Sequence, residues 1–271
     1  MRFFIYLLLL AVGFLVYVRL LERRTVFCPH TDEITVSPAD IRLAYEEVEV
    51  KTPDGFLLNG WFVPAAHPSD RTVTFLFFHG NAGHIGDCLD KIELLHELGG
   101  NTLIIDYRGY GKSEGRPSEE GFYIDARASY DYLAGRKDVN RERIVIYGAS
   151  LGGAAATELA PQRPVGGLVL HATFTSARDV GKMLYPFIPG FLIQTKMDSL
   201  AKVGRIKVPK LFIHSPQDEV IPYEMGKKLF DAAAEPKEFL SIDGTHNEAH
   251  VTSQEAYMAG MRAFLKKYFG Y

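Results

Sequence analysis

The stretch Tyr147-Gly148-Ala149-Ser150-Leu151-Gly152-Gly153 decides the fold of this chain. The apolar run at residues 143–147 is typical of a buried strand, and the alanine-rich segment at residues 154–160 is typical of a helix. A serine between a strand and a helix, flanked by Gly148 and Gly152, fits the sharp turn that presents a nucleophile above a sheet. The glycines let neighbouring backbone pass close by, and the N-terminus of the following helix favours negative charge. The alternative is a glycine-rich turn with an idle serine, and the context favours the nucleophile.

The composition indicates a globular protein with a sizeable core. Its 271 residues can form one large domain or two small ones, and 47% of them are hydrophobic. The formal net charge is −3, with acids and bases mixed along the chain, so we expect no nucleic-acid partner. Cys28 and Cys88 are too few for a disulfide scaffold and lack metal-site spacing. They could pair in an oxidising compartment, but two unpaired thiols are the favoured interpretation.

Residues 3–18 form an uncharged apolar run that ends at Arg19. As a helix this run spans about 24 Å, a little less than the hydrocarbon core of a bilayer. Leu20 and Leu21, together with a snorkelling Arg19, complete a membrane span. The sequence therefore predicts membrane contact through one N-terminal helix.

Two alternatives to an anchor are a cleaved signal peptide and a core helix. No A-x-A-like cleavage site follows the run, and bulky Phe27 disfavours lipoprotein cleavage at Cys28. A core helix would be amphipathic, whereas this run is apolar on all sides. We therefore expect a single-pass anchor over residues 1–24. Basic residues flank the run on both sides, so the side of the membrane that holds the rest of the chain stays open.

The segment after the anchor is expected to be a linker over residues 25–43, followed by one domain over residues 44–271. The domain opens with alternating polar and apolar residues at 45–51 and a second strand at 56–63. The turn Thr52-Pro53-Asp54-Gly55 joins them, which predicts an antiparallel hairpin at the edge of a larger sheet.

From residue 72 onward, unbroken apolar strands alternate with helices. We expect strands at 73–78, 102–105, 143–147, 166–170, 210–214 and 239–242, and helices at 85–98, 118–133, 154–160, 224–233 and 250–268. Ser118 is the expected N-cap of its helix. This alternation predicts an α/β fold with a mostly parallel, eight-stranded sheet that carries helices on both faces. Residues 174–203 alone interrupt the alternation.

In an open parallel sheet the ligand site lies at the carboxyl ends of the strands, so polar residues that directly follow strands are candidate partners of Ser150. The loop His79-Gly80-Asn81-Ala82-Gly83 follows the first buried strand. The backbone N–H groups of Asn81 and Leu151 are the candidate donors of an oxyanion hole. His79 is expected to brace this loop by hydrogen bonding and to transfer no proton.

Two further strand ends supply a candidate acid and a candidate base. Asp218 is the expected acid, while its neighbour Glu219 is expected to lie on a solvated face. His246 is the expected base, and His250 is its main rival. The order Ser150, Asp218, His246 is the nucleophile–acid–base order of one class of hydrolases. In these roles His246 takes the proton from Ser150 as the serine attacks an acyl carbonyl, with no metal or organic cofactor needed.

Together these residues resemble the α/β-hydrolase superfamily over about residues 45–271. The loop at 79–83 and the stretch Asp106-Tyr107-Arg108-Gly109-Tyr110-Gly111-Lys112-Ser113 are similar to signature loops of one branch. That branch holds membrane-anchored, serine-aminopeptidase-like and lysophospholipase-like hydrolases, some of them depalmitoylating thioesterases. The resemblance implies that the second loop is structural, so Asp106 and Arg108 receive no catalytic step.

Residues 174–203 lie where a lid is expected. The apolar residues of this segment include Met183, Leu184, Tyr185, Phe187, Ile188, Phe191, Leu192, Ile193 and Met197. A short apolar lid suits an acyl chain, and an anchor keeps the site near lipid. The alternative is that these residues only seal the core beneath the lid.

The expected function is therefore a serine hydrolase that cleaves carboxylic ester or thioester bonds of small acyl or lipid-like substrates through an acyl-enzyme on Ser150. A serine aminopeptidase-like peptidase is a weaker alternative, because no acidic cluster for a substrate amine is evident. A non-catalytic binding module of the same fold is a second alternative, although an intact set of nucleophile, acid and base is not expected by chance. No obligate protein partner is evident.

Overall fold

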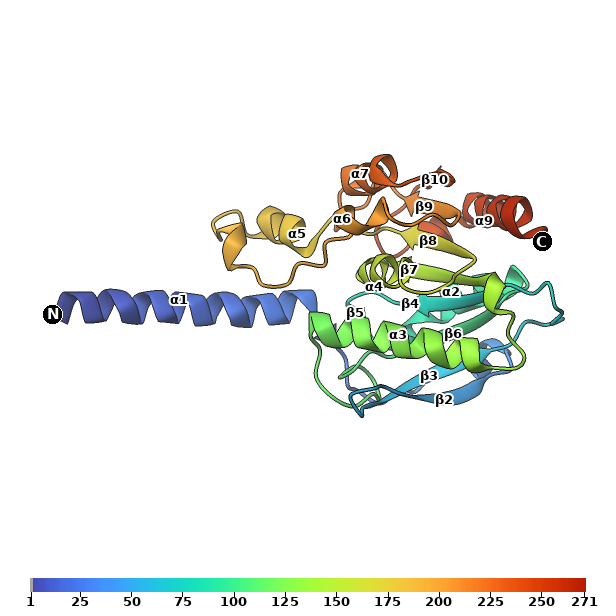
Figure 1. Ribbon diagram of the computed structural model, residues 1–271, viewed down its shortest axis with the longest axis horizontal. Helices are drawn as coiled ribbons and strands as arrows, with labels where there is room; N and C mark the ends of the chain where they lie inside the picture. The colour runs from blue at the N-terminus through green and yellow to red at the C-terminus, as the bar shows by residue number, and fades with distance from the viewer. Residues whose placement is uncertain (1) are drawn as a thin grey trace.

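The computed structural model describes residues 2–271 and consists of a long N-terminal helix and an α/β domain (Figure 1). The strands of the main sheet are β2 (Glu46–Lys51), β3 (Leu57–Val63), β4 (Thr74–Phe78), β6 (Asn101–Ile105), β7 (Ile144–Ala149), β8 (Gly167–His171), β9 (Lys210–His214) and β10 (Lys237–Ser241). Within the described residues they form one eight-stranded sheet in the order β10-β9-β8-β7-β4-β6-β3-β2. Only the β2–β3 and β3–β6 pairs are antiparallel. The predicted sheet and its edge hairpin are confirmed.

Helices cover both faces of this sheet. They are α2 (Leu89–Glu97), α3 (Glu119–Gly135), α4 (Gly152–Leu159), α7 (Tyr223–Ala232), α8 (Ala249–Thr252) and α9 (Gln254–Phe269). Ser118 caps α3 as expected, since its Oγ accepts the Gly121 N–H at 3.1 Å. The helix expected at 250–268 is divided at Ser253, whose hydroxyl accepts the Asp243 N–H and donates to the Asp243 carbonyl oxygen.

Two hydrophobic cores lie on opposite faces of the sheet, and β4 shows how alternation builds them. Leu76 and Phe78 enter the core beneath α3 and α4. Phe75 and Phe77 enter the core beneath α2 and α9. All four side chains are fully buried, as expected for a central strand of a parallel sheet.

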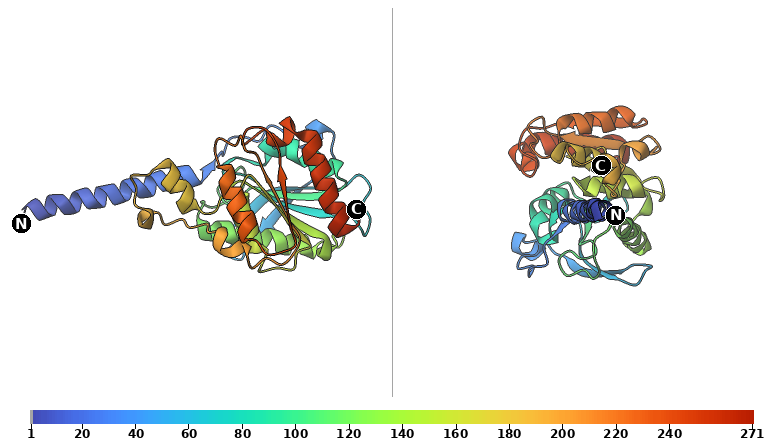
Figure 2. Two further views of the ribbon diagram at one scale, coloured as in Figure 1. Left: turned by 90° about the horizontal axis from the view of Figure 1, so that it is seen from above. Right: turned by 90° about the vertical axis from the view of Figure 1, so that its left-hand side faces the viewer.

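The N-terminal helix α1 (Arg2–Val26) projects away from the domain, as Figure 2 shows from above and end-on. Its most apolar window has a mean hydropathy of 2.4, and only 6% of that window is buried. The helix is therefore long and apolar enough to cross a membrane, a property that signal sequences share.

The segment at residues 25–43 does not run free between helix and domain. It holds a short strand, β1 (Cys28–Pro29), which pairs in parallel with β5 (Ala82–Gly83) in the loop after β4. It also holds a 3₁₀ turn at Pro38–Ile41. The chain that leaves α1 is thus attached to the loop expected to supply an oxyanion donor.

The segment at residues 174–203 lies outside the sheet. It contains α5 (Ala177–Leu184), a 3₁₀ turn at Gly190–Leu192 and α6 (Leu200–Val203). Figure 1 shows α5 and the following loop beside the domain end of α1. Val18 of α1 forms a small buried cluster there with Ile188 and Ile193. We call residues 174–203 the lid.

Candidate active site

Ser150 occupies a strained turn between β7 and α4. Its φ is +50°, in the left-handed region that non-glycine residues rarely adopt, and its N–H is held by the His171 carbonyl oxygen at 2.9 Å. The flanking glycines make this turn possible. A Cβ at Gly148 would lie 2.6 Å from the Gly152 carbonyl oxygen, and a Cβ at Gly152 would overlap the Phe78 carbonyl group. The role expected for these two glycines is therefore visible in the packing.

Ser150, His246 and Asp218 form one hydrogen-bonded chain. The Nε2 atom of His246 lies 3.0 Å from Oγ of Ser150, and its Nδ1 atom lies 2.7 Å from Oδ2 of Asp218. Because the Asp218 carboxylate can only accept a hydrogen bond, Nδ1 of His246 carries a proton. Nε2 of the neutral ring is then free to accept a hydrogen bond from the serine hydroxyl. The three residues follow β7, β9 and β10, so the sheet brings together side chains that are far apart in sequence.

Asp218 is held as a carboxylate. Burial alone would raise its pKa, but hydrogen bonds from His214, from His246 and from the Ile221 N–H bring the pKa well below its usual value. Its Oδ1 atom accepts the N–H groups of Val220 at 2.9 Å and Ile221 at 2.7 Å. The carboxylate therefore keeps its charge and its orientation toward the histidine ring.

The loops that carry the acid and the base are joined by contacts that sequence reasoning missed. Glu219 accepts the His246 N–H at 3.0 Å, so this exposed residue, expected only to face solvent, also holds the histidine loop. Gln217 accepts the Gly244 N–H at 2.9 Å, and Ser215 donates to the Gly244 carbonyl oxygen at 2.6 Å. Their only signal in the sequence is that they lie within three residues of Asp218.

The loop after β4 lies against the nucleophile. A Cβ at Gly80 would be 3.8 Å from Cβ of Ser150. Within residues 2–271 neither the Asn81 N–H nor the Leu151 N–H donates to another backbone group, so both are available to a ligand. The side chain of Asn81 is used elsewhere, since its amide donates to the Thr25 carbonyl oxygen at 3.3 Å.

His79 braces this loop, as expected. It is buried, its Nδ1 donates to the Gly80 carbonyl oxygen at 2.9 Å, and its own carbonyl oxygen accepts the Tyr107 hydroxyl at 2.8 Å. Burial lowers the pKa of His79 to about 4. The ring is therefore neutral near neutral pH and its Nδ1 proton is held by the Gly80 carbonyl oxygen, which fits a structural role.

His250 belongs to a different cluster. Its Nε2 lies 2.5 Å from Asp90 and 3.1 Å from Nζ of Lys91. The neighbouring His171 is buried, and its Nδ1 lies 2.8 Å from the Tyr147 hydroxyl. His250 therefore pairs with Asp90, whereas His246 contacts Ser150.

Arg108 ties the second signature loop to the domain. Its guanidinium donates to Asp125 at 2.7 Å and to Asp54 at 2.7 Å, and its N–H also donates to Asp125 at 2.8 Å. The carboxylate of Asp125 is completely buried. These contacts are structural, in agreement with the role that the family resemblance implied.

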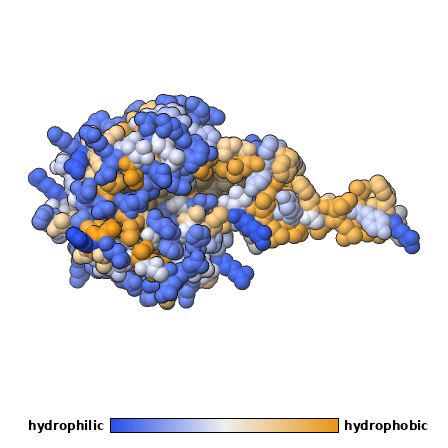
Figure 3. Space-filling view, turned by 180° about the vertical axis from the view of Figure 1, so that it is seen from behind, coloured by the Kyte–Doolittle hydropathy of each residue, from blue (hydrophilic) through white to orange (hydrophobic). Residues whose placement is uncertain are grey.

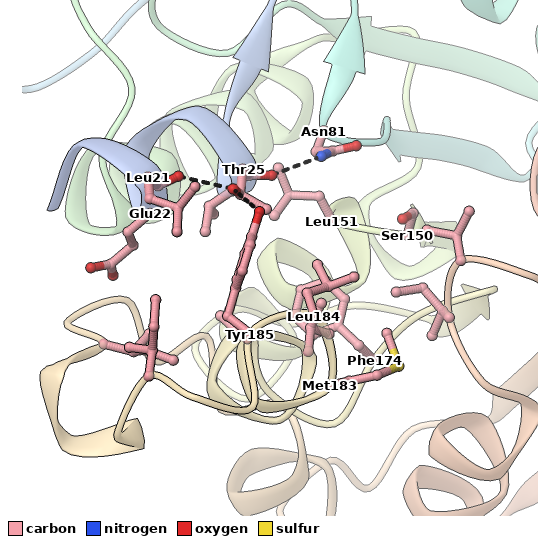
Figure 4. Close-up of a pocket in the computed structure, with 18 of the residues that line it drawn as sticks. Leu21, Glu22, Thr25, Asn81, Ser150, Leu151, Phe174, Met183, Leu184 and Tyr185 are labelled. Carbon is pink, nitrogen blue, oxygen red and sulfur yellow. Dashed lines mark hydrogen bonds between the residues drawn. The ribbon is translucent and has the colours of Figure 1, made fainter. Parts of the chain in front are cut away.

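Two cavities meet at Ser150. The first has a volume of about 370 Å³ and is lined by Leu151, Phe174, the lid and the end of α1 (Figure 4). The second has a volume of about 460 Å³, and its lining includes His246, Asp87 and Lys91. The nucleophile thus stands between a mostly apolar and a more polar space, each of the size of a small-molecule site.

The described residues hold no group of three or more His, Cys, Asp or Glu side chains arranged for a metal ion. Cys28 and Cys88 are both free thiols. Burial raises the pKa of Cys88 to about 12, which disfavours its thiolate at neutral pH.

Comparison with known proteins agrees with this fold. Residues 73–196 match the family model of the alpha/beta hydrolase fold. An uncharacterized protein of Mycobacterium tuberculosis is 36% identical over 260 residues, which cover 95% of this chain and 92% of that protein. The alpha/beta hydrolase domain-containing protein WAV2 of Arabidopsis thaliana is 35% identical over 254 residues, which cover 86% of this chain and 82% of WAV2. The chain therefore belongs to the α/β hydrolase family.

Solved structures share the same architecture. The Pyrococcus furiosus esterase Pf2001 superposes with a TM-score of 0.75 at 22% identity, covering 89% of this chain and 99% of the esterase. Est1E from Butyrivibrio proteoclasticus, solved with ferulic acid bound, superposes with a TM-score of 0.69 at 20% identity, covering 83% of this chain and 100% of Est1E. At these identities the likeness concerns the fold.

Proposed function

We propose that this protein is a serine hydrolase that cleaves carboxylic ester or thioester bonds of acyl or lipid-like substrates. The observation that carries the proposal is the hydrogen-bonded chain from Ser150 through His246 to Asp218. Family membership supports hydrolase chemistry in general, and the esterase Pf2001 shares the fold.

In this mechanism Ser150 Oγ attacks the acyl carbonyl carbon while His246 Nε2 takes the hydroxyl proton. Asp218 holds the ring in the required tautomer and stabilises the imidazolium that forms. The same histidine then gives the proton to the departing alcohol or thiol, which leaves an ester on Ser150. Water, deprotonated by His246, attacks this ester, and the serine regains its proton as the acid is released.

The negative charge on the tetrahedral intermediate would be held by the N–H groups of Asn81 and Leu151. Both donors lack a backbone partner in the described residues, and both residues line the cavity beside Ser150. Loss of one such donor costs about 3 kcal/mol of transition-state stabilisation.

An aminopeptidase is less well supported. Asp87 and Asp90 do line the second cavity, which gives it some acidic character. However, Asp90 is paired with His250, and Asp87 accepts the His84 N–H at 3.0 Å. Both carboxylates already have partners within the domain, and Lys91 adds a positive charge to the same lining, which disfavours a substrate amine.

We also propose that α1 anchors the enzyme, with the anchor at residues 1–24, a docked connector at 25–43 and the hydrolase domain at 44–271. The support is the length and mean hydropathy of the helix. If detergent-free buffer extracts the full-length protein from membranes, this part of the proposal is wrong.

The experiment for the chemistry is active-site labelling of the detergent-solubilised, full-length protein with a fluorophosphonate probe. We expect labelling of the wild type and of Ser69→Ala, a control on an exposed loop before β4. We expect none for Ser150→Ala, and hydrolysis of an acetyl ester should follow the same pattern. Labelling that persists in folded Ser150→Ala would overturn the proposal.

A further inference from the structure

The apolar cavity beside Ser150 has one wall made by the N-terminal helix itself. Val18, Leu21, Glu22 and Thr25 line it. These positions are three or four residues apart and therefore share one face of α1. The facing wall belongs to the lid, and Figure 4 shows Tyr185 of the lid pointing toward Thr25. The cavity is thus closed on one side by an element expected only to tether the domain.

This face of the helix is docked on the lid. Val18 is 2% exposed and packs against Ile188 and Ile193. Polar contacts continue the same interface. The Thr25 hydroxyl lies 3.2 Å from the Tyr185 hydroxyl, Arg19 donates to the Leu192 carbonyl oxygen, and Glu22 accepts the Thr195 N–H. The helix end and the lid are therefore joined by a continuous interface whose polar groups are paired.

The cavity begins at the last residues of the expected membrane span of α1. The uncharged run stops at Val18, and the wall extends from Val18 to Thr25, about 10 Å along the helix axis. Next to it the lid exposes Phe187 (65%) and Phe191 (80%) to the surroundings. Figure 3 shows apolar surface continuing from the helix onto the part of the domain beside its base. Such a surface suits the headgroup–acyl boundary of a bilayer.

The position of His246 distinguishes the two cavities chemically. His246 lines the second cavity and is absent from the lining of the first. The group that departs must receive its proton from this histidine, so it occupies the second cavity, beside Asp87 and Lys91. The acyl part then extends into the first cavity, between α1 and the lid.

We infer that the last turns of α1 form an acyl-chain site, and that the substrate is a membrane lipid whose fatty-acyl chain reaches Ser150 from the bilayer between α1 and the lid. The inference rests on the proposed function of Ser150 and adds the substrate class and its route. The anchor is on this view part of the binding site. The alcohol part of the lipid, which departs with the proton from His246 when the acyl C–O bond breaks, leaves through the second cavity.

A direct test maps the chain on the full-length protein in phospholipid nanodiscs. The probe is a long-chain alkyl fluorophosphonate that carries a diazirine along the alkyl chain. After reaction with Ser150 and irradiation, we expect the crosslinked peptides to come from residues 18–26 and from the lid. Crosslinks confined to the lining of the second cavity, such as Asp90 or Asn247, would overturn the inference while the labelling of Ser150 would still support the hydrolase.

A second test changes the wall. Leu21→Trp fills the cavity, and Leu20→Trp is the matched control, because Leu20 is 53% exposed and does not line the cavity. With acetyl, octanoyl and palmitoyl esters, we expect Leu21→Trp to lower the palmitoyl-to-acetyl ratio of kcat/KM at least tenfold, the order expected when a chain is excluded from an apolar pocket. Leu20→Trp should keep the wild-type ratio. An unchanged ratio in Leu21→Trp, with acetyl hydrolysis retained, contradicts the acyl site and leaves the proposed chemistry intact.

Discussion

The side-chain amide of Asn81 donates a hydrogen bond to the backbone carbonyl oxygen of Thr25, 3.3 Å away. This contact joins the loop beside Ser150 to the last turn of the N-terminal helix. The Cys28 N–H strengthens the connection by donating to the Asn81 carbonyl oxygen at 2.9 Å. The same oxygen also accepts the Tyr110 hydroxyl at 2.9 Å. The residue proposed to stabilise the oxyanion is thus held in place by the segment that leaves the anchor.

Asn81→Ala should therefore slow catalysis although the backbone N–H stays. Without the amide contact to Thr25, the loop can move and the N–H is no longer aimed at the oxyanion. We expect kcat for an acetyl ester to fall by up to about 10²-fold, the order of losing one oxyanion donor, with little change in KM. Steady-state kinetics in detergent measure both. Cys28→Ser is the control, because it keeps the main-chain bond to Asn81, and a wild-type kcat in Asn81→Ala would show that the contact does not position the loop.

Asp218→Asn should nearly abolish turnover without unfolding the protein. The amide can still accept the N–H groups of Val220 and Ile221, but its NH₂ group would face Nδ1 of His246. The ring would then carry its proton on Nε2 and could not accept the proton of Ser150. We expect kcat to fall by about 10⁴-fold at neutral pH, as for other triads with this change.

Glu219→Gln is the matched control for that variant. Its amide oxygen can still accept the His246 N–H. The change also removes one negative charge next to Asp218, as Asp218→Asn removes one at Asp218 itself. We expect kcat to remain near that of the wild type. If Glu219→Gln lost as much activity as Asp218→Asn, the assignment of Asp218 as the orienting acid would be wrong.

The positions of Ser150, Asp218 and His246 could be predicted from the local pattern of apolar strands combined with the topology of a parallel sheet. Each residue follows a short apolar strand, and parallel strands end at one edge of a sheet. The strands were recognisable from unbroken apolar runs, and the β2–β3 hairpin was recognisable from alternation around a Pro-Asp-Gly turn. Local sequence therefore carries most of the information for this part of the fold.

The attachment of α1 to the rest of the domain could not be predicted in the same way. Arg19 contacts Leu192, which is 173 residues away, through a backbone carbonyl group that any residue would supply. The β1–β5 pair involves two residues from each side, too short for a visible period. The division of the last helix depends on a hydroxyl at Ser253 that binds Asp243. Contacts of this kind leave no periodic signal, so the sequence predicts the apolar helix and the polar segment after it but not their attachment to the lid and to the loop after β4.

Arg108→Ala should destabilise the fold far more than it affects the chemistry. The change removes the guanidinium from Asp125, whose side chain is fully buried, and leaves the N–H of residue 108 as its remaining donor from this loop. Removing one member of such a pair costs about 3–5 kcal/mol, because a buried charge stays uncompensated. Urea unfolding can be followed by the fluorescence of Trp61, the single tryptophan, which is buried in β3.

The control for Arg108 is Arg163→Ala. Arg163 pairs with Asp131 at the surface, where the two side chains are 29% and 54% exposed. A surface pair contributes at most about 1 kcal/mol, so we expect a small change in the free energy of unfolding. Equal losses in the two variants would contradict a structural role for the buried Arg108 network, as would a loss of fluorophosphonate labelling in folded Arg108→Ala.

Asp106→Asn should remove a pH dependence of stability. Burial raises the pKa of Asp106 to about 7 from an ordinary value of 3.8, although its Oδ1 accepts the Ile85 N–H at 2.9 Å. Between these two pKa values the folded protein retains a proton on Asp106 that the unfolded chain has lost. The stability contributed by the neutral carboxyl therefore falls as pH rises toward 7 and is lost above it. The amide keeps an acceptor for the Ile85 N–H and does not titrate. We therefore expect the unfolding free energy of Asp106→Asn minus that of the wild type to increase between pH 5 and pH 8, by an amount on the order of 1–3 kcal/mol. Urea titrations at both pH values, again with Trp61 fluorescence, measure this difference, and a difference that is constant with pH would show that Asp106 is ionised in the folded protein throughout this range.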